Sequence, residues 1–230
     1  MRRLVLAAVI AVALASPASA QDGRALFDEA CSTCHGDDAN GIRGTAPTLH
    51  GVGRQAADFY LSTGRMPLAD PEDEPIRTRP AYTAAERKAL IDYIGSLGGP
   101  DIPKVDPAQG SLSDGQELFA SHCAGCHQIV AQGGVVPGGV APPLQEATPT
   151  QIAEAVRVGP YLMPKYSERQ IDQHQLDSIT RYVLSTRHPP DRGGWGIGNI
   201  GPIPEGMVAW LLAGAALLIV ARLLGERRPT

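Results

Sequence analysis

The sequence predicts a mainly α-helical protein with two similar domains and one membrane-spanning helix near its C-terminus. Short motifs recur once in each half of the 230-residue chain. The readable periodic segments have helical spacing of apolar residues, and none alternates convincingly with a period of two. The chain holds 26 Gly and 20 Pro, and only 5% of its residues are aromatic. Loop-rich domains with such modest cores usually need additional stabilisation, for example from a metal, disulfides or a cofactor.

The N-terminal segment 1–20 has the organisation of a secretory signal peptide. Arg2 and Arg3 precede an apolar run over residues 4–14, and Ala18-Ser19-Ala20 forms a small-residue cleavage site. The apolar run is short for a spanning helix, so we expect cleavage. A retained N-terminal anchor is the alternative.

An internal repeat defines the domain boundaries. The repeated pieces are GRALF at 23–27 and GQELF at 115–119, GTAPTL at 44–49 and GVAPPL at 139–144, and Met-Pro at 66–67 and 163–164. The offset between copies varies slightly, as expected of an old duplication. We therefore expect one domain over 21–98 and a second over 115–190, joined by a Gly/Pro/Asp linker over 99–114.

Each predicted domain closes with a helical stretch, at 83–97 and 168–185. Thr83 and Glu86 form a capping box at the start of the first stretch. Thr148 is a further capped start, and Pro149 suits the first position of the helix that follows it.

The cysteines of the chain are Cys31, Cys34, Cys123 and Cys126. They form two Cys-x-x-Cys pairs, followed directly by His35 and His127, and Cys-x-x-Cys-His is the attachment signature of c-type haem. Two thiols on one helical turn can reach both vinyl groups of one porphyrin edge, and the adjacent His then faces the iron. The sequence therefore predicts two covalently bound haem c groups with their iron.

A four-cysteine zinc site is the alternative for these motifs. Zinc ribbons pair two Cys-x-x-Cys motifs across about 15–20 residues. Here 88 residues separate Cys34 from Cys123. Export of the thiols and the His after each pair also favour haem.

Met66 and Met163 each follow one haem motif and each precede a proline. A core Met is the ordinary interpretation of such a residue. Their placement, one in each repeat, favours axial ligation instead. We expect His35 and Met66 on the first iron and His127 and Met163 on the second. Thioether ligation raises the haem potential, and a six-coordinate iron has no open position for a substrate.

Pro47 and Pro142 occupy equivalent places in the two Gly/Pro-rich loops. We expect each to set a carbonyl or a rigid loop against the proximal His and thereby fix its tautomer. The alternative is that each proline only bends or terminates its loop and has no role toward the histidine.

Other polar residues have no counterpart in the second repeat. We expect four histidines to be surface or core residues: His50, His122, His174 and His188. An acidic cluster follows Met66, formed by Asp70, Glu72, Asp73 and Glu74. It could dock a basic partner, or it could be a solvated loop.

The segment 206–224 is predicted to be a transmembrane helix, because it is apolar except for one charge, Arg222, close to its end. A helix of this length would be about 28 Å long, which matches the hydrocarbon thickness of a bilayer. Arg227 and Arg228 lie in the tail 225–230 and predict a cytoplasmic C-terminus. A Gly/Pro-rich linker over 191–205 leads into this helix, and a buried amphipathic helix is the alternative.

The exported part of the chain is expected to be residues 21–205, with the haem domains on the extracytoplasmic side of the cell membrane. This part carries 15 basic and 23 acidic residues, a net charge of −8. Such a charge argues against nucleic acid and against docking on anionic lipid.

The chain resembles the dihaem cytochrome c subunit (cytochrome cc) of the actinobacterial cytochrome bcc complex, a menaquinol–cytochrome c reductase. The matching segments are CSTCH at 31–35, STGRMPL at 62–68, LGGP at 97–100, CAGCH at 123–127, ATPTQ at 147–151 and GGWGIGNIGPIPEGM at 193–207. The resemblance implies two class I cytochrome c domains. The acidic loop 69–80 departs from the family's pattern.

The resemblance also implies partners. They are the cytochrome b subunit, the Rieske iron–sulfur subunit and the cytochrome c oxidase subunit with the dinuclear copper centre. Electrons would pass from the Rieske centre through the haem at Cys31/Cys34, then the haem at Cys123/Cys126, to the oxidase. The chain itself would be an electron-transfer component of the reductase, with no catalytic residue of its own.

Two other functions fit the motifs. One is a membrane-anchored dihaem carrier that serves a different dehydrogenase or reductase. The other is a dihaem peroxidase, which needs an iron with an open or displaceable position. The two Met-Pro pairs argue against the peroxidase.

Overall fold

The computed structural model describes residues 22–188 and 202–225, with side chains from residue 206 onward in the second range. The chain divides into one compact unit that ends at Thr186 and another that begins at Arg187. The expected signal peptide, residues 191–201 of the expected linker with most of the matching segment 193–207, and the tail beyond residue 225 lie outside the described residues. Residues 202–205, which were expected to belong to that linker, instead form the start of the last helix.

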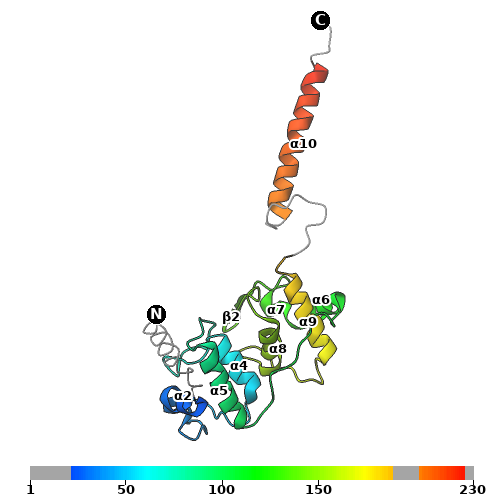
Figure 1. The fold of residues 1–230 in the computed structure, drawn as a ribbon. Coiled ribbons are helices and arrows are strands. Elements are labelled where there is room, and N and C mark those ends of the chain that lie inside the picture. The colour runs from blue at the N-terminus through cyan, green and yellow to red at the C-terminus, as the bar shows by residue number, and fades with distance from the viewer. Residues whose placement is uncertain (1–21, 189–201, 226–230) are drawn as a thin grey trace, which may run out of the picture. The chain divides into compact units, whose positions relative to one another are not determined.

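The first unit contains the two repeats as two helical domains (Figure 1). The first domain comprises α2 (Gly23–Ala30), α3 (Ser32–His35), α4 (Gly53–Ser62) and α5 (Ala84–Ser96). The second comprises α6 (Leu112–His122), α7 (Ala124–His127), β1 (Gly134–Val136), β2 (Gly139–Ala141), α8 (Pro149–Val158) and α9 (Gln173–Ser185). The mainly helical prediction is confirmed.

The same helix crossing builds both domains. A Cβ at Gly23 of α2 would lie 2.0 Å from the carbonyl oxygen of Ala89 on α5. A Cβ at Gly115 of α6 would lie 2.0 Å from the carbonyl oxygen of Ser178 on α9. Only glycine allows backbones to approach so closely.

An aromatic pair lies beside each crossing. The ring centroids of Phe27 and Tyr93 are 5.2 Å apart, and those of Phe119 and Tyr182 are 5.3 Å apart, both with an interplanar angle of 48°. Phe27 and Phe119 are almost completely buried. The duplicated motifs GRALF and GQELF therefore supply the same two packing elements, a glycine for the crossing and a phenylalanine for the core.

The capping residues act as the sequence predicts at two helices. Thr83 and Glu86 form a capping box at α5, and Thr148 and Gln151 form one at α8. The last helix differs from its prediction, because α9 begins at Gln173 instead of residue 168. Asp172 caps it by accepting a hydrogen bond from the backbone N–H of Gln175, so the chain before it is a turn.

The linker between the domains is shorter than expected and is held at both ends. Helix α6 begins at Leu112, inside the predicted linker. The carbonyl of Pro100 accepts a hydrogen bond from the N–H of Gln55 in the first domain. The N–H of Asp106 donates to Asp177 in the second domain at 2.9 Å. The linker is therefore packed against both domains.

The two domains contact one another through α4 and α8 (Figure 1). The Gln151 side chain of α8 donates to the Ser62 hydroxyl of α4 at 3.2 Å. These helices have equal length and equivalent places in the repeat. The domains thus meet through matching elements.

The second unit contains α10 (Pro202–Gly225). Its residues Gly206–Gly225 have a mean hydropathy of 2.3, and their apolar side chains are exposed. An apolar helix of this length that is not covered by protein is a candidate membrane anchor.

Candidate haem centres

Each Cys-x-x-Cys-His motif forms a short helix directly after the first helix of its domain. Cys31 and Cys123 each donate their backbone N–H to a phenylalanine carbonyl, Phe27 or Phe119, at 2.8 Å. The N–H of the following His donates to the carbonyl of the first Cys at 2.9 Å in both domains. One helical turn therefore presents both thiols and the histidine beside the buried core.

The four cysteine thiols are unpaired. Burial raises the pKa of Cys31 to about 11, and the nearby Cys34 adds to this shift. Cys123 is raised to about 11 by burial and by Cys126. Cys31 packs against the core of the first domain and Cys123 against that of the second. Because the pairs belong to separate cores, they do not form one four-cysteine zinc site.

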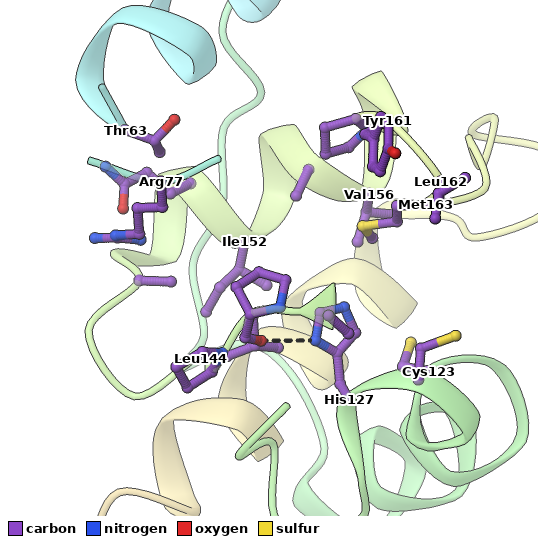
Figure 2. Close-up of a pocket in the computed structure, with 18 of the residues that line it drawn as sticks. Thr63, Arg77, Cys123, His127, Leu144, Ile152, Val156, Tyr161, Leu162 and Met163 are labelled. Atoms are coloured by element: carbon purple, nitrogen blue, oxygen red, sulfur yellow. Dashed lines mark hydrogen bonds between the residues drawn. The ribbon is translucent and has the colours of Figure 1, made fainter. Parts of the chain in front are cut away.

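The two histidines of the haem motifs have equivalent partners, each a proline carbonyl of its own domain. Nδ1 of His35 lies 2.9 Å from the carbonyl oxygen of Pro47. Nδ1 of His127 lies 3.1 Å from the carbonyl oxygen of Pro142, the dashed line in Figure 2. A carbonyl oxygen only accepts hydrogen bonds, so Nδ1 carries the proton and Nε2 keeps its lone pair for a metal. Burial also lowers the pKa of His127, which favours the neutral ring that a metal needs.

Two glycines that sequence reasoning missed bring these carbonyls close. Each lies six residues after its histidine, so the repeat spacing could have revealed them. A Cβ at Gly41 would lie 2.5 Å from the carbonyl carbon of Pro47, and one at Gly133 would lie 2.7 Å from that of Pro142. Both glycines have positive φ and donate their N–H to the carbonyl of the preceding histidine.

The two methionines lie against the same cores as the cysteines. Met66 packs with Cys31 on the first core, and Met163 packs with Cys123 on the second. Both are partly buried. Each domain thus brings together one Cys-x-x-Cys-His motif, one proline carbonyl and one thioether.

A cavity of about 350 Å³ opens beside the second motif. Cys123, Cys126, His127 and Met163 all line it, and its other walls are mostly apolar. In Figure 2 the Met163 sulfur lies across the space from the His127 ring, with Cys123 at one end. A neutral imidazole and a thioether facing each other in an apolar space, with two thiols at one edge, fit a covalently attached haem.

The second cavity extends beyond its own domain. Residues of the first domain, including Thr63, Arg65 and Arg77, form part of its wall. Sequence reasoning missed this role: Thr63 and Arg65 stand out only as part of the matching segment 62–68, and their contribution to the wall depends on how the domains pack.

One of the histidines expected to lie outside the sites does not. His50 has an ordinary partner, since its Nε2 lies 2.9 Å from the carbonyl of Asp38. The His122 ring lies beside Tyr166, and His122 lines the second cavity, which corrects the expectation for this residue. The acidic loop 69–80 contacts the second domain, because Tyr161 donates its hydroxyl to Glu74 at 2.6 Å and Arg77 donates to the carbonyl of Glu146 at 3.4 Å. Asp70, Glu72 and Asp73 are exposed.

Comparisons with known proteins agree with the two-domain arrangement. Residues 20–98 match the family described as cytochrome c. Residues 110–183 match the family described as cytochrome C oxidase, cbb3-type, subunit III. Both are haem-binding cytochrome c domains, and the chain therefore carries two covalently bound haem c groups.

Relatives that span most of the chain are more specific. A protein of Corynebacterium diphtheriae named cytochrome bc1 complex cytochrome c subunit is 35% identical, over 90% of this chain and 80% of its own length. A Mycobacterium tuberculosis protein of the same name is 35% identical, over 92% and 79%. A cbb3-type cytochrome c oxidase subunit of Azospirillum is 30% identical, over 70% and 60%. The duplicated haem motifs and the similarity over about 90% of the chain show that this chain belongs to the family of cytochrome c subunits of the cytochrome bc1 complex.

Proposed function

We propose that this chain is a two-haem electron relay within a quinol–cytochrome c reductase. In this proposal protein ligands occupy both axial positions of each iron. Its haems supply one-electron storage at two positions. The observation that carries the proposal is the repeated set of contacts, in which one proline carbonyl, one histidine and one methionine accompany each Cys-x-x-Cys pair.

The proposed ligand sets follow the two domains. Cys31 and Cys34 attach the first haem, with His35 and Met66 on its iron. Cys123 and Cys126 attach the second, with His127 and Met163 on its iron. Pro47 and Pro142 hold the two imidazoles in the tautomer that ligates through Nε2. A ligand on each side leaves no position for peroxide, which argues for a carrier and against a peroxidase.

The proposed partners are the cytochrome b and Rieske subunits on the donor side and the copper subunit of cytochrome c oxidase on the acceptor side. Similarity to subunits of the bc1 complex over about 90% of the chain supports the first two. Electrons would enter at the Cys31/Cys34 haem and leave from the Cys123/Cys126 haem.

The proposed location is the cell membrane, with α10 as the anchor. Arg227 and Arg228 follow the apolar segment and favour a cytoplasmic C-terminus. The haem domains would then face the extracytoplasmic side, where the thiols are attached to haem. Protease protection in closed vesicles, with an epitope at the C-terminus, tests this orientation.

Co-purification tests the assembly. Affinity purification of the full-length chain in mild detergent is expected to bring down a cytochrome b and a Rieske protein in equal amounts with it. A chain that emerges alone with both haems reduced by another dehydrogenase would support an independent anchored carrier instead.

A matched pair of ligand variants tests the order of the haems. Replacing Met163 with His should slow delivery of electrons to the oxidase after a pulse of quinol, while the first haem still becomes reduced. Met66→His should slow reduction of both haems. Normal oxidase reduction in the Met163→His complex would contradict the order.

A further inference from the structure

The cavity of the second domain contains two guanidinium groups that belong to the first domain. Arg65 is only 8% exposed, and its Nη1 is buried without a hydrogen-bond partner. Arg77 lines the same cavity and donates only a long hydrogen bond, 3.4 Å, to the carbonyl of Glu146. Neither arginine takes part in any of the ion pairs found among the described residues.

Backbone contacts hold the two arginines near each other. The N–H of Thr78 donates to the carbonyl of Thr63 at 3.1 Å, and its hydroxyl donates to the carbonyl of Gly64. The turn before Met66 is thereby joined to the segment that carries Arg77. Arg65 also stacks on Phe59, with its guanidinium carbon 4.8 Å from the ring centroid.

This arrangement is unfavourable without an anion. The Arg65 guanidinium is buried, and Arg77 lines the same mostly apolar cavity, so two like charges share one space. A buried charge with an unpaired donor and a like charge nearby costs free energy until an anion joins it. The acidic residue on this wall is Glu74, whose carboxylate accepts a hydrogen bond from Tyr161.

The chemistry of the cofactor indicates which anion comes to this place. Thioether bonds fix the vinyl edge of the second haem at Cys123 and Cys126, and a haem carries its two propionates on the opposite edge. Figure 2 shows Arg77 and Thr63 at the end of the cavity away from Cys123. Cys31, Cys34, His35 and Met66 do not line this cavity.

We propose that Arg65 and Arg77 of the first domain bind the propionates of the second haem. Arginine suits this role, because its planar fork pairs with a carboxylate through two parallel hydrogen bonds. The first domain would then set the potential of the haem held by its neighbour. The inference assumes the second haem of the proposed function but does not depend on its axial methionine.

The test is a redox titration of the full-length holoprotein in detergent. A variant with Cys31→Ser and Cys34→Ser keeps only the second haem and identifies its reduction step. Ferric haem carries one more positive charge than ferrous haem, so removing a nearby cation favours the ferric state. Arg77→Gln and Arg65→Gln should each lower the equilibrium constant for reduction of the second haem by about tenfold, which is about 59 mV for one electron.

Two further variants separate charge from packing. Arg65→Lys keeps the charge and is expected to recover most of the potential, even if Arg65→Gln disturbs the stacking on Phe59. Arg79→Gln, on the same exposed segment but outside the cavity wall, should leave both steps unchanged.

Unchanged second-haem potentials in Arg77→Gln and Arg65→Gln, or a shift of the first haem alone, would overturn the inference. Failure of the proposed ligand set would appear separately, as a second reduction step that Met163→His does not move.

Discussion

The two haem domains share a skeleton but differ in what encloses the haem-binding side. In both, a glycine permits the helix crossing, a Phe–Tyr pair lies beside it and a proline carbonyl holds the histidine. His127 is 8% exposed, whereas His35 is only partly buried. The cavity beside His127 includes walls from the other domain. Duplication repeated the attachment site, and packing of the copies then made their surroundings unequal.

The largest effect is expected from substitutions that disrupt the helix crossing shared by the two domains. Gly115→Ala places a Cβ against the backbone of α9, and Gly23→Ala does the same against α5. Because the backbone cannot move away easily, each change should cost about 3 kcal/mol in its own domain, at the upper end of the usual range for overpacking. Thermal unfolding and haem absorbance per polypeptide should show loss of one domain and one haem.

Gly125→Ala is the matched control, since a Cβ there meets nothing within 4 Å. It lies inside the second haem motif, yet it should leave the haem content unchanged. Equal effects of Gly125→Ala and Gly115→Ala would show that the crossing is not the cause.

The second effect concerns the contact between the domains. Glu154 on α8 is completely buried, and Asp58 on the facing α4 interacts with its carboxyl group. Burial, with the negative charge of Asp58, raises the pKa of Glu154 to about 9 from an ordinary value of 4.5. Between these two pH values, Glu154 therefore stays protonated in the folded protein but is ionised in the unfolded chain.

Stability should consequently fall as the pH rises through that window, by about 1.4 kcal/mol per pH unit from this group alone. Glu154→Gln should remove this slope and stabilise the protein above pH 7. Chemical denaturation at several pH values measures the effect, with the exposed Glu117→Gln as the control. An unchanged slope in Glu154→Gln would contradict the assignment.

A smaller effect compares the two aromatic pairs. Tyr182 donates its hydroxyl to the carbonyl of Ile129 at 2.7 Å and is buried, so Tyr182→Phe should cost about 1 kcal/mol. The Tyr93 hydroxyl accepts from the exposed Arg24, which also pairs with Asp28. Tyr93→Phe should therefore cost about half as much or less. Equal losses in thermal unfolding would show that the two pairs are energetically equivalent.

The smallest effect tests the acidic loop. Glu74→Gln replaces the carboxylate that accepts from Tyr161, at an exposed position. Stability should change by less than about 0.5 kcal/mol. A larger loss in denaturant unfolding would mean that this contact holds the domains together.

The sequence was most informative where residues repeat. The capping boxes at Thr83 and Thr148 and the His–Pro pairs were readable, because each depends on local spacing or on a motif that occurs twice. Arg65 and Arg77 were not readable, since their role depends on how one domain covers the cavity of the other. The predicted start of the last helix, residue 168, was too early, because the capping side chain of Asp172 begins the helix at Gln173. No motif marks Glu154, and its burial depends on how α4 packs against α8.

The central claim is that both haems are closed electron carriers. Carbon monoxide added to the fully reduced, full-length holoprotein tests it most directly, because carbon monoxide needs an open position on ferrous iron. We expect two haems per chain, two one-electron reduction steps and an unchanged spectrum with carbon monoxide. A carbon monoxide adduct at either haem in the unmodified protein would contradict it.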